Sequence, residues 1–229
     1  MTILLALALC ASDPPERKPA TAKEALQAVS VFVGSWKGTG TPEGTREEKA
    51  AGAWYETISW VWRFKGDDVW LEASFEKGKH FAKGELRYNV QKQTYQLTLT
   101  TPDKSTHTYS GALKDKTLTL DRTDKGATQD ERLVFSLLHH NRYLYRFESR
   151  PGGGAGSFVK KYQVGATKEG VPFADVAKGP ECIVSGGFAA TKFSYKGKDY
   201  YVCCSGCRDA FKDEPEKYIK EAEEKAKKK

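Results

Sequence analysis

Much of the chain alternates apolar and polar residues with a period of two. Within residues 54–64, the positions Trp54, Ile58, Trp60 and Trp62 are apolar and most residues between them are polar. The same alternation recurs in later segments, at residues 69–75, 86–90, 95–99, 118–120, 133–137 and 143–147. A period of two is typical of β-strands with one buried and one solvated face, as in an antiparallel sheet.

Short turn sequences separate these segments. They include Lys65-Gly66-Asp67-Asp68, Lys77-Gly78 and Pro151-Gly152-Gly153-Gly154. We expect about ten strands in chain order, with no helices between them, because turn residues recur at short intervals. A sheet of this kind removes its exposed edges when it closes on itself. We therefore predict a mainly β fold, an antiparallel up-and-down barrel rather than a sandwich, which a small α+β module rich in cysteine follows.

The first predicted strand carries a family resemblance. Its sequence is Phe32-Val33-Gly34-Ser35-Trp36-Lys37-Gly38-Thr39-Gly40. This stretch resembles the Gly-x-Trp-x-Gly strand that begins calycin-type barrels, and in particular nitrobindin-like and fatty-acid-binding-like barrels. The glycines allow a curved strand that neighbours approach closely, and Trp36 is placed to plug the barrel base. The resemblance implies a calycin-like barrel over residues 22–165 that holds a small apolar ligand.

The alternation of inward and outward residues along each strand, its parity, selects candidates for contact with that ligand. It places His139 on the inward face, and it places Trp60, Trp62 and Tyr145 there as well. Nitrobindins hold haem through an axial histidine, so an inward His139 is a candidate haem ligand. A hydrogen-bonded cavity histidine, or a histidine at the barrel mouth, explains His139 equally simply, and we do not expect haem. The inward aromatic residues can also fill the cavity and leave no ligand site.

The first residues read as a targeting segment. The apolar run MTILLALALC precedes a polar stretch with several prolines that ends near residue 21. Its length suits a secretory signal and is too short for a stable membrane span. We therefore expect residues 1–21 to be a signal peptide and tail, and the protein to be exported to the periplasm or cell exterior. Lipid attachment at Cys10 is an alternative, although Leu9 stands where a lipobox has a small residue.

Composition excludes several functions. The chain has 229 residues, with 37 Lys+Arg against 30 Asp+Glu and a formal net charge of +7. The positive surplus is spread over the chain with no basic stripe, so we expect no nucleic-acid partner. The sequence contains no Gly-x-Ser-x-Gly elbow, P-loop, dinucleotide fingerprint or His-Glu-x-x-His motif. Because these catalytic signatures are absent, we do not expect an enzyme.

The cysteines are unevenly distributed and carry most of the chemical information. After Cys10 there is none until Cys182, and then Cys203, Cys204 and Cys207 follow. We expect a linker at residues 166–180 and a compact module at 181–229 in which a hairpin ends at Cys203 and a helix carries Cys207. The sulfurs of Cys182, Cys203 and Cys207 can then converge, because residues four apart share one helix face. So small a module needs a metal, disulfides or docking to a larger domain.

Thiolates favour soft or borderline ions such as Zn²⁺ or Cu⁺. A disulfide formed after export, or a set of reduced structural thiols, remains an alternative to a metal. Cys204 is an additional candidate as a metal ligand or redox partner. We rank it outside the ligand set, because adjacent cysteines seldom bind one ion together.

Landmarks around these cysteines carry a second resemblance. They are Cys182, Tyr195-Lys196-Gly197, Tyr200-Tyr201-Val202-Cys203, Cys207-Arg208, Phe211 and Pro215-Glu216-Lys217-Tyr218. Together they closely resemble the YHS/TRASH domain, a family with a proposed role in heavy-metal trafficking, resistance and sensing. The resemblance implies that Cys182, Cys203 and Cys207 are metal ligands. The family often has Pro-Val-Cys-Gly-Met at the first cysteine, whereas this chain has Glu181-Cys182-Ile183-Val184-Ser185.

The leading hypothesis is an exported, non-enzymatic protein that binds a metal ion, Zn or Cu, for buffering, trafficking or sensing. Its expected partners are the metal ion and a small apolar ligand, with no stable membrane span. Two alternatives remain open at this point. One is a small-molecule carrier whose cysteine module is purely structural, and the other is a haem-binding barrel.

Overall fold

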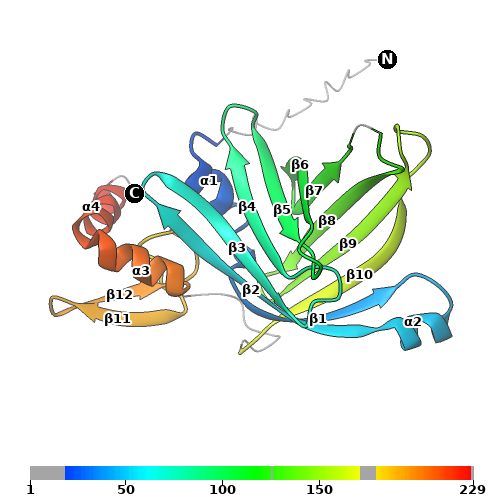
Figure 1. Cartoon of the computed structure of the whole chain (residues 1–229). Coiled ribbons are helices and arrows are strands. Elements are labelled where there is room, and N and C mark those ends of the chain that lie inside the picture. The colour runs from blue at the N-terminus through cyan, green and yellow to red at the C-terminus, as the bar shows by residue number, and fades with distance from the viewer. Residues whose placement is uncertain (1–18, 125, 171–178, 228–229) are drawn as a thin grey trace, which may run out of the picture.

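Ten strands form a closed barrel, and a small module with two strands and two helices lies beside it (Figure 1). The computed structural model describes residues 19–124, 126–170 and 179–227. Cys10 and most of the predicted signal segment therefore lie outside the described residues. The barrel strands are β1 (Gly34–Pro42), β2 (Trp54–Lys65), β3 (Asp68–Glu76), β4 (Lys83–Asn89), β5 (Thr94–Thr100), β6 (Thr106–Lys114), β7 (Thr117–Arg122), β8 (Gln129–His139), β9 (Arg142–Pro151) and β10 (Val159–Lys168).

Each barrel strand pairs antiparallel with its neighbours in sequence, and β1 pairs with β10 to close the sheet. The predicted mainly β, up-and-down barrel is confirmed. Closure gives every strand two partners, which removes the exposed edges that an open sheet presents. Strand β10 continues to Lys168 and so extends three residues into the stretch predicted as a linker.

Alternation along β2 matches the predicted pattern. Trp54, Ile58, Trp60 and Trp62 are buried, while Tyr55 is 75% exposed on the outer face. The inward set also includes Glu56, which is only 4% exposed. Its carboxylate accepts hydrogen bonds from Trp54 Nε1 at 3.1 Å and from the Tyr145 hydroxyl at 2.7 Å. A buried carboxyl group needs such donors, because an unpaired one is costly to remove from water.

The glycines of β1 leave room for side chains that β2 places against the strand. A Cβ atom on Gly40 would lie 2.1 Å from the ring of Trp54, so a larger residue is excluded at that position. Trp36 on the same strand is fully buried and meets Tyr143 edge to face at 4.8 Å. The Gly-x-Trp-x-Gly strand therefore brings backbone and indole rings together as the motif implied.

Two short helices close one end of the barrel. Helix α1 (Ala22–Gln27) is capped by Thr21, and the 3-10 helix η1 (Ser30–Phe32) follows it. The Tyr95 hydroxyl donates to the Ala25 carbonyl at 2.7 Å, and the Phe32 ring stacks on Trp60 at 5.4 Å. Aromatic side chains thus fill this end of the barrel.

A helix that the strand pattern did not predict lies between β1 and β2. Helix α2 (Arg46–Gly52) begins with a capping box, in which Thr45 and Glu48 each accept from the other's backbone amide. The Thr-x-x-Glu spacing is the sequence signal for this helix. A search for alternating apolar and polar residues misses this helix, because none of its residues is buried.

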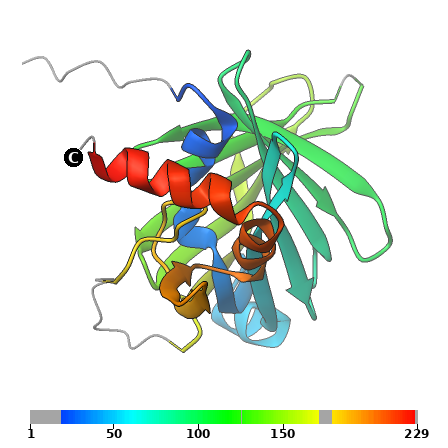
Figure 2. The same ribbon diagram turned by 90° about the vertical axis from the view of Figure 1, so that its left-hand side faces the viewer.

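The C-terminal module contains β11 (Thr191–Tyr195), β12 (Lys198–Val202), α3 (Ser205–Asp213) and α4 (Pro215–Lys227). Its core is the buried ring of Phe211, which contacts Phe193 at 5.0 Å, Tyr200 at 5.3 Å and Tyr195 at 5.5 Å. Figure 2 shows α4 passing over α1, and an ion pair between Lys23 and Glu221 at 3.2 Å joins these two helices.

Helix α3 packs directly on the barrel strand β2. Gly206 makes this approach possible, because a Cβ atom there would lie 1.7 Å from the Trp62 carbonyl oxygen. The small module therefore shares its core with the barrel, as expected for a unit too small to stand on its own core.

Candidate metal centre

Three cysteine sulfurs meet where the module contacts the barrel. Cys182 comes from the loop before β11, Cys203 follows β12, and Cys207 lies in the first turns of α3. Their Sγ atoms all lie within 4.8 Å of one another, and those of Cys203 and Cys207 are 3.5 Å apart. In the described part of the chain, this is the one group of three or more His, Cys, Asp or Glu side chains placed to share a metal ion.

The spacing of these sulfurs suits thiolate coordination. A Zn–S bond of about 2.3 Å puts the sulfurs of a tetrahedral centre about 3.8 Å apart. All the separations are below 4.8 Å and that of Cys203 and Cys207 is 3.5 Å, so three thiolates can reach one ion with small side-chain adjustments. All four cysteines of the module are free thiols in this structure.

A tight loop holds Cys182 in position. The Gly186 amide donates to the Cys182 carbonyl at 2.8 Å, and the Cys182 amide donates to the Gly187 carbonyl at 2.7 Å. Gly186 has a φ of 74°, a left-handed conformation that favours glycine. The Ile183 amide donates to the Tyr201 carbonyl at 3.0 Å and ties the loop to β12. The loop therefore places Cys182 beside Cys203 at the end of that strand.

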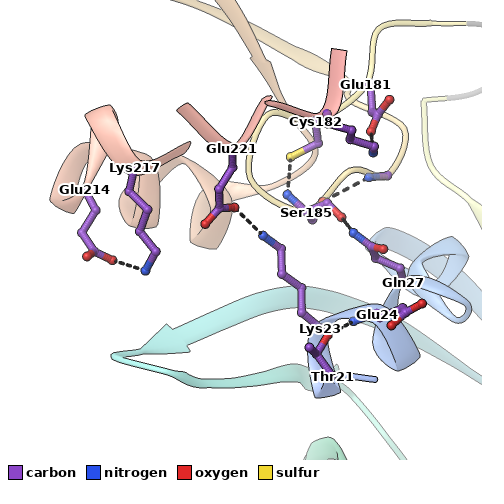
Figure 3. Close-up of polar contacts among 12 residues, drawn as sticks. Thr21, Lys23, Glu24, Gln27, Glu181, Cys182, Ser185, Glu214, Lys217 and Glu221 are labelled. Atoms are coloured by element: carbon purple, nitrogen blue, oxygen red, sulfur yellow. Dashed lines mark hydrogen bonds and ion pairs between the residues drawn. The ribbon is translucent and has the colours of Figure 1, made fainter. Parts of the chain in front are cut away.

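Ser185 is a part of this centre to which the sequence assigned no role. It is fully buried, and its amide donates to Cys182 Sγ at 3.4 Å (Figure 3). Its Oγ lies 3.4 Å from Cys203 Sγ. The Ser185 Oγ also accepts from the Gly187 amide at 3.4 Å, and its hydroxyl proton is available to a thiolate at Cys203. From α1, the Gln27 side-chain amide donates to the Ser185 carbonyl. The family's Gly-Met after the first cysteine corresponds to Ile183-Val184, so the motif ends one residue before Ser185.

The cluster is largely sealed from solvent. Cys182 is 1% exposed and Cys207 is fully buried, while Cys203 is half-buried. Hydrogen bonds from the thiols of Cys203 and Cys207 lower the pKa of Cys182. Hydrogen bonding to Cys182 raises the pKa of both Cys203 and Cys207. A cation that takes all three as thiolates therefore releases protons from the cluster.

A basic side chain of the barrel lies near the sulfurs. Lys168, at the end of β10, is half-buried with its ammonium 5.2 Å from the centre of the Trp36 ring. Burial lowers the pKa of Lys168, and attraction to Cys203 opposes that shift. Its positive charge favours a thiolate at Cys203.

Cys204 lies beside Cys203 and Cys207 but is not a member of the three-sulfur group. It is the N-cap residue of α3, its Sγ lies 3.8 Å from Cys203 Sγ, and it does not join the three-sulfur group. A hydrogen bond from Cys203 is the largest cause that lowers the pKa of Cys204. Hydrogen bonds from Cys207 and from backbone groups that include Trp62 lower this pKa further. The pKa of Arg63 on β2 is raised mainly by its hydrogen bond to Glu72, and a negative charge on Cys204 contributes to the same shift.

The predicted cavity candidates of the barrel do not line a common site. Trp60, Trp62 and Tyr145 are each at most 2% exposed and belong to the packed core. The inward placement predicted for His139 is wrong, because its side chain is exposed. The β8–β9 register shifts between Leu137 and His139, and this bulge ends the period-two parity. His139 Nδ1 instead lies 2.8 Å from Asn141 Oδ1, outside the core.

Glu56 is a second buried polar residue that the alternation concealed. It occupies an inward position between Trp54 and Ile58, where the sequence pattern drew attention only to apolar residues. Its carboxylate links β2 to Tyr145 on β9 across the barrel interior.

None of the described helices combines the length and the apolar character needed to cross a membrane.

Comparison with known proteins agrees with the geometry of the module. Residues 187–222 match the YHS domain family, which confirms the resemblance seen in the sequence. The matched stretch contains Cys203 and Cys207, whereas Cys182 and Ser185 precede it. No curated protein shows significant similarity to this chain.

Two solved structures illustrate what the barrel is similar to. The crystal structure of Rv2717c from M. tuberculosis shares 15% identity, covers 63% of this chain and 97% of its own, and has a TM-score of 0.38. The structure of EF1p2_mFAP2b bound to DFHBI shares 12% identity, covers 63% of this chain and 99% of its own, and has a TM-score of 0.23. The barrel topology described above rests on the strand pairing of this chain itself.

Proposed function

We propose that the protein, with its YHS domain at residues 187–222, binds one soft or borderline metal ion, Zn²⁺ or Cu⁺, through Cys182, Cys203 and Cys207. The observation that carries this proposal is the convergence of three buried sulfurs within 4.8 Å from three separate segments. Holding a loop, a strand end and a helix together at this point costs conformational freedom, so a stabilising interaction is needed there. Coordination of a metal ion provides that interaction.

The donor set favours a role in holding and passing on metal. Three thiolates leave a tetrahedral ion one position short of four protein ligands. An open position lets an incoming ligand bind before a cysteine leaves, which suits buffering, trafficking or sensing. Sulfur donors favour Zn²⁺ and Cu⁺ over hard ions such as Mg²⁺ or Ca²⁺.

Hydrogen bonds from Ser185 support the same centre. Its amide and hydroxyl reach two different sulfurs, Cys182 and Cys203, and neither contact requires movement of the buried residue. Donors of this kind orient ligands and disperse thiolate charge around a metal.

We place this activity outside the cytoplasm. The support is the apolar run at residues 1–10 and the polar stretch that follows it. An oxidising compartment makes metal occupancy important, because free thiols this close together form disulfides there. The absence of catalytic motifs in the sequence supports a binding protein rather than an enzyme.

Metal analysis of the reduced, full-length protein tests the proposal. We expect native mass spectrometry to show one Zn²⁺ or Cu⁺ per chain, and each of Cys182→Ser, Cys203→Ser and Cys207→Ser to lower occupancy at least tenfold. Cys204→Ser is the matched control and should keep its metal, since Cys204 is outside the three-sulfur group. A wild-type protein that retains no stoichiometric metal under reducing conditions would refute the proposal. The same spectra of exported protein report the signal cleavage site.

A further inference from the structure

Of the four cysteines that the structure describes, Cys204 is the one that the proposed metal site does not use. It lies outside the three-sulfur group, although its Sγ is only 3.8 Å from Cys203 Sγ and it also lies beside Cys207. All four are free thiols in this structure. Once an ion occupies the other three sulfurs, Cys204 is therefore the thiol of the cluster that remains available for a reaction.

Cys204 and Cys207 form a Cys-x-x-Cys pair at the start of α3. The sequence is Cys204-Ser205-Gly206-Cys207, with Cys204 as the N-cap residue and Cys207 in the first turn. Residues three apart face each other across a helical turn, so small adjustments bring this pair into the range of a disulfide. A thiolate at a helix N-terminus also faces the positive end of the helix dipole, which favours its attack on a disulfide.

The two members of the pair differ in exposure. Cys204 is half-buried, whereas Cys207 is fully buried. A disulfide in solution therefore reaches Cys204 before it reaches Cys207. Cys203 is half-buried too, but it is a proposed metal ligand, and its sulfur lies 3.4 Å from the Ser185 hydroxyl and 3.5 Å from Cys207 Sγ. The first reaction is thus expected at Cys204.

Geometry selects the sulfur that reacts second. Cys203 is adjacent to Cys204 in the chain, and adjacent Cα atoms are about 3.8 Å apart, below the range of about 4.4–6.8 Å that disulfides usually span. A bridge from Cys204 to Cys207 crosses one helical turn and avoids that restriction. Cys207 is also one of the three proposed ligands, so a disulfide at Cys207 removes a thiolate from the metal.

We propose that Cys204 and Cys207 form a dithiol–disulfide pair through which a small disulfide in solution releases the metal ion. The inference rests on the function proposed above, because it describes the regulation of the same site. The Cys204 thiolate attacks one sulfur of the small disulfide, which forms a mixed disulfide and releases one small thiolate. The Cys207 thiolate then attacks Cys204 Sγ, which forms the Cys204–Cys207 disulfide and releases the second small thiolate.

Two electrons pass from the protein to the small disulfide in this exchange, and the metal ion keeps its charge. The ion retains Cys182 and Cys203 alone as protein ligands and dissociates, because its affinity depends on the number of thiolates that hold it. A reducing dithiol reverses both steps and restores the three-thiolate site.

The test uses the full-length protein loaded with Zn²⁺ and treated with 2-hydroxyethyl disulfide. We expect a chromophoric chelator to record release of the metal, and peptide mapping by mass spectrometry to show a Cys204–Cys207 disulfide. Dithiothreitol should then restore Zn²⁺ binding.

Two variants locate the reaction. Cys204→Ser should hold Zn²⁺ as tightly as the wild type but release it at least tenfold more slowly on addition of the disulfide, because the ion occupies the other three thiolates. Ser205→Ala is the matched control, since it changes the exposed neighbour of Cys204 and should release Zn²⁺ at the wild-type rate.

The proposal is overturned if Cys204→Ser releases Zn²⁺ as fast as the wild type, or if the disulfide joins Cys203 to Cys207 or includes Cys182. Should Cys204→Ser fail to fold, one equivalent of iodoacetamide is added to the zinc-loaded wild type. Alkylation at Cys204 that blocks later release supports the proposal, and release that continues after this alkylation refutes it.

The metal content before oxidation separates the two proposals. A wild type that holds no Zn²⁺ refutes the metal site, and the inference that rests on it fails with it. A wild type that holds Zn²⁺ and keeps it in excess 2-hydroxyethyl disulfide refutes the dithiol–disulfide pair alone.

Discussion

At the scale of single residues, two buried polar side chains, Ser185 and Glu56, each contact two partners. Ser185 is fully buried and reaches two sulfurs that come from different segments. Glu56 is nearly as buried and satisfies two donors from β2 and β9. Each residue joins one partner close in the chain to one that is more distant, so each substitution leaves more than one group without its contact.

Ser185→Ala should weaken metal binding about tenfold or more, because Cys203 loses a hydroxyl donor close to its sulfur. The measurement is competition for Zn²⁺ against a chromophoric chelator. Ser194→Ala is the matched control, since the Ser194 hydroxyl bonds to Asp199 at 2.6 Å on an exposed part of the module. Equal affinities in the two variants would contradict a role for Ser185 at the centre.

Glu56→Ala should lower the free energy of unfolding by about 2–4 kcal/mol, because the Trp54 indole and the Tyr145 hydroxyl both lose their acceptor. Glu56→Gln keeps an oxygen acceptor and should cost less. Urea denaturation checks both values. Glu76→Ala, at an exposed position of β3, serves as the reference, and a loss in that variant as large as in Glu56→Ala would count against the argument.

At the scale of elements, the contact between α3 and β2 decides where the cluster forms. Gly206 lets the helix approach the Trp62 carbonyl, and Cys207 follows Gly206 directly. A helix held away from β2 would also move Cys207 away from Cys203. The position of the third sulfur therefore depends on a glycine that is not itself a ligand.

Gly206→Ala should destabilise the protein by about 1–3 kcal/mol, because its methyl group overlaps the Trp62 carbonyl and forces α3 outward. It should also weaken Zn²⁺ binding. Thermal unfolding with and without Zn²⁺ measures both effects. Ser205→Ala alters the exposed neighbouring residue and should leave both quantities close to wild type, so parallel losses in the two variants would disprove the packing explanation.

At the scale of the whole molecule, the barrel and the module behave as one packed body. The five tryptophans all belong to barrel strands, at Trp36, Trp54, Trp60, Trp62 and Trp70. The cysteines of the cluster all belong to the module. Tryptophan fluorescence therefore reports unfolding of the barrel, whereas the proposed metal ligands belong to the module.

Saturating Zn²⁺ should raise the unfolding temperature recorded by tryptophan fluorescence, because the metal binds only the folded cluster that rests on β2. At a free concentration 100 times the Kd, the expected stabilisation is about 2.7 kcal/mol. The Cys182→Ser variant should show no such shift. A fluorescence transition unchanged by Zn²⁺, in a protein shown to bind it, would mean that barrel and module unfold independently.

The sequence by itself determined the strands, the barrel class and the spacing of the candidate ligands. Period-two alternation and a Cys-x3-Cys step are local patterns, and residues close in the chain remain close in space. Alternation also predicted correctly that Trp60, Trp62 and Tyr145 point inward.

Only the tertiary structure decided which distant residues meet. A bulge between Leu137 and His139 reversed the parity that had placed His139 inside. The approach of the Ser185 hydroxyl to Cys203 and the contact of α3 with β2 both arise between segments that are separated in the chain. Such contacts depend on how the sheet closes and how the module packs on it, and no local pattern specifies either.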